Sequence, residues 1–180
     1  MKIALSMWPN LETNERYFKA SELEQVRALF AEILPRDPAR QIPGATDAGA
    51  ADFVDHILAM PVEVYEEIPL WQTRYRQGLP ELESNAKDLF GSSIIALSSV
   101  QRIDLITRLQ AGQLKSFGTV PGTDVFTVAL QKELFTTLRR HCIQGCFADP
   151  RWGGNKDRII WKWFGYLQPA EDVVVAEGEL

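Results

Sequence analysis

Hydrophobic residues recur at helical spacing along most of the chain, and turn-forming residues separate the segments that show this pattern. The first segment places Leu23, Val26 and Phe30 on one face, because residues three or four positions apart lie on the same side of a helix. Ser21 is expected to cap this helix, with Glu24 three residues later, and Pro35 is expected to end it. The pattern predicts an amphipathic helix that packs on a core.

The same pattern predicts five more helices. The predictions are a helix from Thr46 or Asp47 through Leu58, one from Val64 towards Gly78 with a kink at Pro69, one over Leu79 to Phe90, one capped by Ser98 or Ser99 that ends at Gly112, and one capped by Thr123 or Asp124 that ends at Gly145. The last is predicted to be the longest. Only Val173 to Val175 has strand character.

These patterns predict an all-α fold: a single compact helical domain of about six helices with an irregular C-terminal segment rich in glycine and aromatic residues. We expect an irregular N-terminal arm over residues 1–19, the helical domain over residues 20–168 and an acidic tail over residues 169–180. A chain of 180 residues is long enough for one domain to bury about 70% of its unfolded surface.

Composition and charge exclude several classes of protein. The formal net charge of −5 does not provide the clustered lysine and arginine that nucleic-acid binding requires. No apolar run reaches the length of a membrane-spanning helix. The first residues lack a secretory apolar region and twin arginines, so we expect a cytoplasmic protein; a periplasmic one is the alternative, if a twin-arginine signal has been removed.

The chain offers few residues for chemistry. Neither a GxGxxG turn nor a P-loop occurs, so we expect the chain to bind no nucleotide cofactor itself. His141, Cys142, Cys146 and Asp149 form the only cluster with metal-ligand chemistry, which falls short of a committed zinc site. A Cys142 to Cys146 disulfide requires the helix to end near Gly145. No nucleophile has a legible base and orienting group, so we expect neither a catalytic nor a metal-binding residue.

Aromatic residues are concentrated near the C-terminus. Trp152, Trp161, Trp163, Phe164 and Tyr166 occur within fifteen positions that also contain three glycines, and Phe147 precedes them. So many rings are difficult to bury in one small core, and tryptophan and tyrosine often anchor protein interfaces. The segment is therefore a candidate docking surface.

The motif from Gly145 to Asp157, followed by Trp161 and Gly165-Tyr166, resembles the gluconate 2-dehydrogenase subunit 3 family. The family pattern has a glycine, two aromatics, a small residue, Asp-Pro, an aromatic, Gly-Gly-Asn, a tryptophan and a final Gly-Tyr. Residues 33–37 and 43–55 resemble two further family blocks, and the likeness covers roughly residues 17–168. Cys146 stands where the family usually has an aromatic residue.

The resemblance implies a non-catalytic small subunit of an FAD-dependent dehydrogenase complex that oxidises a sugar, a glucoside or gluconate. It implies that the large subunit, a flavoprotein of the glucose-methanol-choline (GMC) type, holds FAD and is stabilised and escorted by the small one, with a cytochrome c subunit as a further partner in some complexes. Six residues are then expected to form or support the contact with the flavoprotein: Phe147, Trp152, Asn155, Trp161, Trp163 and Tyr166. The alternatives are a free-standing helical adaptor and a thiol or metal enzyme that uses Cys142 and Cys146.

Overall fold

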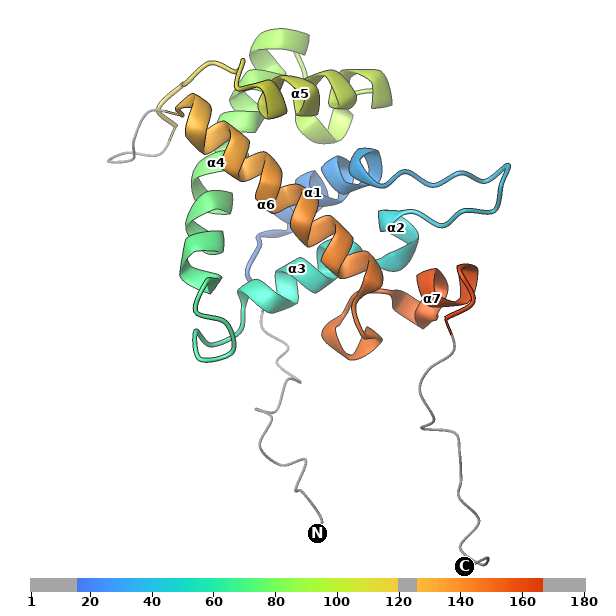
Figure 1. The fold of residues 1–180 in the computed structure, drawn as a ribbon. Coiled ribbons are helices and arrows are strands. Elements are labelled where there is room, and N and C mark those ends of the chain that lie inside the picture. Colours follow the sequence, from blue (N-terminus) through green and yellow to red (C-terminus); the bar gives the residue numbers. More distant parts are fainter. Residues whose placement is uncertain (1–15, 120–125, 167–180) are drawn as a thin grey trace, which may run out of the picture.

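The computed structural model describes residues 16–119 and 126–166, in which the regular elements are helices (Figure 1). They are α1 (Ala20–Ile33), α2 (Ala45–Ala48), α3 (Ala50–Leu58), α4 (Ile68–Phe90), α5 (Ser99–Ala111), α6 (Val128–Phe147) and α7 (Ile159–Trp163), with single 3-10 turns η2 (Ile94–Ala96), η3 (Pro150–Trp152) and η4 (Lys156–Arg158). These ranges contain no strand, only an isolated bridge between Asp37 and Ile42. The all-α prediction is confirmed, whereas Val173 to Val175 lies outside the described residues.

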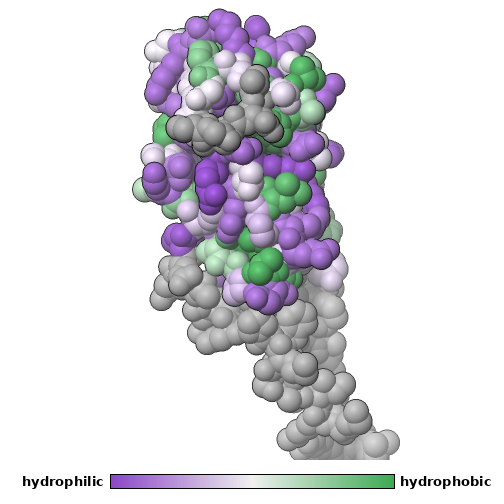
Figure 2. Space-filling view, turned by 90° about the vertical axis from the view of Figure 1, so that its left-hand side faces the viewer, coloured by the Kyte–Doolittle hydropathy of each residue, from purple (hydrophilic) through white to green (hydrophobic). Residues whose placement is uncertain are grey.

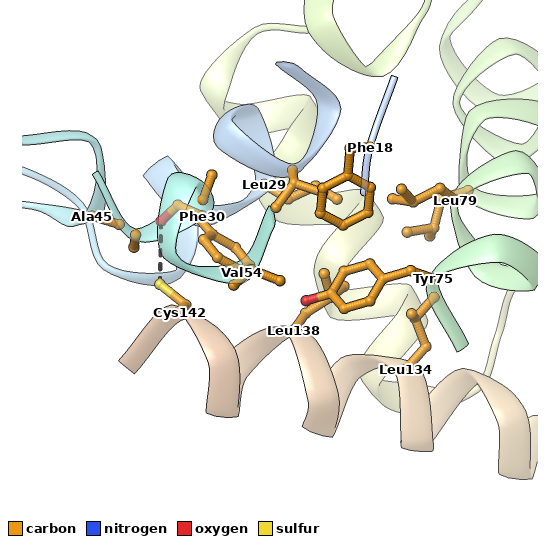
Figure 3. Close-up of a cluster of buried hydrophobic side chains, with 14 of the residues drawn as sticks. Phe18, Leu29, Phe30, Ala45, Val54, Tyr75, Leu79, Leu134, Leu138 and Cys142 are labelled. Atoms are coloured by element: carbon orange, nitrogen blue, oxygen red, sulfur yellow. Dashed lines mark hydrogen bonds between the residues drawn. The ribbon is translucent and has the colours of Figure 1, made fainter. Parts of the chain in front are cut away.

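Helix α6 runs through the middle of the molecule, and α1, α3, α4 and α5 pack around it (Figure 1). The core lies between these helices. Figure 3 shows Phe18, which precedes α1, Tyr75 of α4, and Leu134 and Leu138 of α6 meeting there; each is at most 7% exposed. None of the described helices is long and apolar enough to cross a membrane.

The start and end of α5 follow local signals. The Ser98 side chain accepts a hydrogen bond from the Gln101 N–H, and the Gln101 side chain accepts one from the Ser98 N–H at 2.9 Å. Gly112 adopts the left-handed conformation and ends the helix. At α1 the predicted cap is wrong, because the N-cap is Lys19, two positions before Ser21: the Glu22 carboxylate accepts from the Lys19 N–H at 2.9 Å.

Two predicted helices are one helix in the structure. Pro69 lies in the first turn of α4, where its missing N–H would have no helical partner, so it starts the helix and does not kink it. Gly78 was predicted to be a boundary, but it lies inside α4 against Leu134: a Cβ at this position would lie 2.3 Å from a Leu134 methyl carbon. Close packing on α6 therefore explains this glycine.

Two other predicted helices also have different boundaries in the structure. Gly49 adopts a left-handed conformation and divides the predicted second helix into α2 and α3. Helix α6 begins after the cap Thr127, whose side chain accepts from the Leu130 N–H, and it continues through Phe147, past the predicted end at Gly145. It has 20 residues and α4 has 23, so the prediction that it is the longest is wrong.

Buried polar side chains hold the irregular segments on the helical body. The Asp55 carboxylate accepts hydrogen bonds from the backbone N–H groups of Tyr17 and Phe18 at 2.9 and 2.8 Å. The Gln131 side chain accepts from the Leu114 N–H and donates to the Leu114 carbonyl, both at 2.9 Å. Such bonds compensate for burying the polar groups and fix where each segment lies.

Candidate protein interaction site

The C-terminal segment, residues 148–166, folds back from the end of α6 through η3 and η4 to α7, which lies beside α2 (Figure 1). Its position is set by contact between two stretches of backbone. A Cβ at Gly154 would lie 2.1 Å from the carbonyl oxygen of Gly145, and the same oxygen accepts a hydrogen bond from the Asn155 N–H at 2.9 Å. Only glycine fits at Gly154, because no side chain allows this approach.

Gly145 also lies close to the backbone of α3. A Cβ at this position would lie 2.7 Å from the carbonyl oxygen of Ala50, the first residue of α3. The backbones of α3, α6 and the C-terminal segment are thus stacked through two glycines. The prediction that Gly145 ends the helix is wrong for this reason: the residue provides a close contact inside α6.

Asn155 links this contact to α7. It is fully buried, has a left-handed φ of 42°, and its Oδ1 accepts a hydrogen bond from the Ile160 N–H at 3.0 Å. Asparagine adopts this backbone conformation more readily than other residues with a Cβ. Its role is therefore to orient α7, and its side chain is not accessible from outside.

Lys156 ties the same turn to the body through Asp52 of α3. The lysine side chain crosses Gly49, and its Nζ forms an ion pair with Asp52, which also pairs with Arg27 of α1. Burial alone would raise the pKa of Asp52, but the hydrogen bonds from Lys156 and Arg27 lower it below its ordinary value. The three side chains hold α1, α3 and the C-terminal segment together.

Aromatic rings at the end of α6 and in this segment are exposed. Phe147, Phe164 and Tyr166 are 45–46% exposed, and Trp161 is partly buried beside them. The ring centroids of Phe147 and Phe164 are 5.9 Å apart, and those of Trp161 and Tyr166 are 5.0 Å apart. The Trp161 Nε1–H donates to the Phe147 carbonyl oxygen at 3.1 Å. We call these four residues the aromatic surface; contiguous exposed apolar area of this kind is typical of an interaction site.

The surface on the α4 side differs from the aromatic surface in its hydropathy. The face on the α4 side is mostly hydrophilic, with hydrophobic residues in small separate groups (Figure 2). Single exposed hydrophobic residues such as Leu70 are ordinary in folded proteins.

The six predicted contact residues do not all lie on one surface. Phe147, Trp161 and Tyr166 belong to the aromatic surface, and Trp163, 50% exposed, lies on the other side of α7. Trp152 is partly buried and packs against the core, so with Asn155 it supports the segment.

Phe164 is the member of the aromatic surface that the prediction of contact residues omitted. Its place between Trp163 and Tyr166 in the sequence was the available signal.

The two cysteines lie in the core. Cys142 and Cys146 are free and fully buried within α6, and the Cys142 thiol donates to the Phe30 carbonyl oxygen at 3.9 Å (Figure 3). A hydrogen bond with Cys146 and burial raise the pKa of the Cys142 thiol. The helix end that a disulfide requires is absent at Gly145, since α6 continues to Phe147. Within residues 16–119 and 126–166, no group of three or more His, Cys, Asp or Glu side chains is placed to hold a metal ion.

The model of the family described as gluconate 2-dehydrogenase subunit 3 matches residues 20–168. The chain belongs to this family. The match covers every described helix and both glycines of the backbone contact, so the C-terminal segment is part of the subunit 3 domain. Searches of curated proteins and of solved structures found no match to this subunit 3 family member.

Proposed function

We propose that this chain is the small, non-catalytic subunit of a dehydrogenase complex and that it stabilises and escorts a catalytic flavoprotein. In this proposal the partner is of the GMC type, holds FAD and oxidises a sugar, a glucoside or gluconate. A cytochrome c subunit that accepts the electrons is a further partner. Membership of the subunit 3 family supports the assignment to a dehydrogenase complex.

The observation that carries the proposal is the aromatic surface. Phe147 ends α6, and the other three rings lie on a segment whose backbone is fixed by Gly145, Gly154 and Asn155, so the backbone that carries these exposed rings is held in place. Rigid exposed aromatic side chains bind a partner with little loss of conformational entropy. His141 is buried in the core and forms a hydrogen bond with Tyr75 at 3.1 Å, so its position is explained by packing.

The proposal is tested by co-expressing the tagged chain with a GMC-type flavoprotein and measuring how much flavin-containing protein co-purifies. The double variant Phe147→Ala, Phe164→Ala should weaken the complex about 100-fold, because anchoring aromatic residues each contribute about 1–2 kcal/mol to binding. Tyr65 and Phe117 provide a matched control, since they are 48% and 42% exposed on other parts of the surface. Changing both of these to alanine should leave the complex intact.

Two results would contradict the proposal. If no flavoprotein co-purifies with the unchanged chain, a free-standing adaptor is favoured. If the purified chain alone oxidises a sugar, or contains stoichiometric metal that is lost in Cys142→Ala, it is an enzyme in its own right.

A further inference from the structure

A groove of about 590 Å³ lies on the other side of α7 from the aromatic surface. One wall is α7, through Ile159, Lys162 and Trp163, and the other is the loop of residues 36–43 between α1 and α2. In Figure 1 this loop projects beyond the helical body above α7. Helix α7 therefore separates two adjoining surfaces, and the groove continues the proposed interaction site.

The groove is rich in positive charge, although the chain has a net charge of −5. Three cationic residues, Arg36, Arg40 and Lys162, line it beside a single carboxylate, that of Asp47. The two arginines have carboxylate neighbours, Asp47 and Asp37, but both ion pairs are long at 3.7 Å and both arginine side chains are more than 60% exposed. Within the described parts of the chain, no ion pair joins Lys162 to another residue. These cations are free to turn towards an incoming carboxylate.

Apolar side chains lie between the charges. Trp163 is half exposed, and Ile42, Pro38 and Pro43 form the opposite wall. A free inorganic anion would not use these rings and aliphatic groups. A peptide that carries both carboxylates and apolar side chains matches both features of the groove.

The walls are already in place. The loop is closed by two hydrogen bonds between the backbones of Asp37 and Ile42, each 2.9 Å long, and α7 is fixed by Asn155. A Cβ at Gly44 would lie 2.5 Å from the Arg36 backbone nitrogen, so the loop base is closely packed. A preformed groove loses little conformational entropy when it is filled.

We propose that the groove binds an acidic, extended segment of the catalytic partner subunit. This inference rests on the proposed function, because it assigns a second contact to the same interface. Charge complementarity between the groove and the segment is the chemical basis of recognition, and the shared helix α7 makes the two contacts continuous.

A direct test needs no flavoprotein. A fluorescein-labelled hexapeptide that alternates glutamate and valine is titrated against the full chain, and fluorescence polarisation is measured. We expect saturable binding that weakens as salt is added, and about tenfold weaker binding in Arg40→Glu, Lys162→Glu, because two exposed ion pairs are lost. The control Lys132→Glu, Arg139→Glu makes the same charge change on exposed positions of α6 and should bind as before. Equal binding by both variants, or by a hexapeptide that alternates lysine and valine, would overturn the proposal.

The same variants are then measured in the complex. If Arg40→Glu, Lys162→Glu also weakens the complex about tenfold, the groove contacts the partner. If the complex is unaffected while the hexapeptide no longer binds, the groove is not part of the interface, and the proposal fails although the proposed function stands. If the hexapeptide binds only after residues 167–180 are deleted, the occupant is the chain's own acidic end, which carries Glu171, Asp172, Glu177 and Glu179, and the proposal is likewise overturned.

Discussion

In the helical body, Phe18, Trp71 and Tyr75 are at most 7% exposed, whereas Phe147 and Phe164 at the C-terminal end are 46% exposed. The two regions are built differently. The body is held together by side chains that interlock around α6, as Figure 3 shows. The C-terminal segment is held by the close backbone contacts of Gly145 and Gly154 together with Asn155, Lys156 and Trp152, and its other rings face outwards. Aromatic residues that are not needed for packing are available for binding.

The most disruptive test of this contrast is Gly154→Ala. The added Cβ would lie 2.1 Å from the Gly145 carbonyl oxygen, and the Gly145 backbone cannot retreat because it is itself packed against Ala50 of α3. We expect the free energy of unfolding to fall by about 3 kcal/mol or the segment to detach, because overpacking against backbone is not relieved by rotamer changes. Urea unfolding gives the first quantity, and hydrogen exchange of residues 148–166 gives the second.

Gly91→Ala is the matched control. Gly91 ends α4 with a φ of +68° and has no atom within 4 Å of its Cβ position, so the only cost is backbone strain of about 1 kcal/mol. If the two variants lose equal stability, the backbone stack does not hold the segment.

The stability of the helical body should depend on pH through the buried His141. His141 is 2% exposed, stacks on Tyr75 and meets the edge of Trp71, and burial, together with the charges of Arg140 and Arg74, lowers its pKa to about 3. In the unfolded chain the His141 side chain has a pKa of about 6.5. Between about pH 3 and pH 6.5 the unfolded state therefore binds more protons than the folded state, and the free energy of unfolding falls as the pH is lowered below about 6.5. From pH 7.5 to 4.5 the free energy of unfolding should fall by about 2.5 kcal/mol because of His141.

His141→Gln separates this contribution from that of the carboxylates. Glutamine has no titratable proton and can still form a hydrogen bond with the Tyr75 hydroxyl. The difference in unfolding free energy between the two proteins, measured at a series of pH values, should change by about 2.5 kcal/mol over the same range. A difference that is constant with pH would mean that His141 titrates in the fold as it does in the unfolded chain, so that burial does not lower its pKa.

A smaller effect is expected at Asn155, which joins the backbone stack to α7. Asn155→Ala removes the acceptor for the Ile160 N–H and places alanine at a φ of 42°, so it should cost about 2 kcal/mol. Asn155→Gly loses the same hydrogen bond without the strain and should cost about 1 kcal/mol. Thermal or urea unfolding of both distinguishes the contributions; equal losses would show that strain is unimportant here.

The sequence predicted those parts of the fold that depend on local signals. The apolar faces of the helices and the Ser98 cap of α5 follow from residues close in sequence, and they agree with the structure. Glycines were harder to interpret. Gly91 and Gly112 end helices, but Gly78 and Gly145 lie within them because a distant side chain or backbone approaches closely. A single sequence does not distinguish these two uses, since the approaching residue is far away in the chain.

The candidate site shows the same limit. The concentration of rings and the Gly-Gly-Asn turn were visible in the sequence, and they led to Phe147, Trp161 and Tyr166. Which residues support and which are exposed depends on how the segment packs on α3, and no local pattern encodes it. The groove was missed for the same reason: its two walls are about 120 positions apart in the chain, and α7 itself was not predicted.

The smallest expected effect gives the sharpest test of the contrast. Phe164 is almost half exposed, so Phe164→Ala should lower the free energy of unfolding by less than about 1 kcal/mol, close to the value for Tyr65→Ala on the body. A buried aromatic residue would cost about 3–5 kcal/mol. Urea unfolding therefore decides whether the ring belongs to a core or to a surface. A loss in the larger range would show that Phe164 is needed to pack the C-terminal segment against the body, and the ring would then not be available to bind a partner. A small loss, together with a weakened complex, is the combination that only a docking role produces.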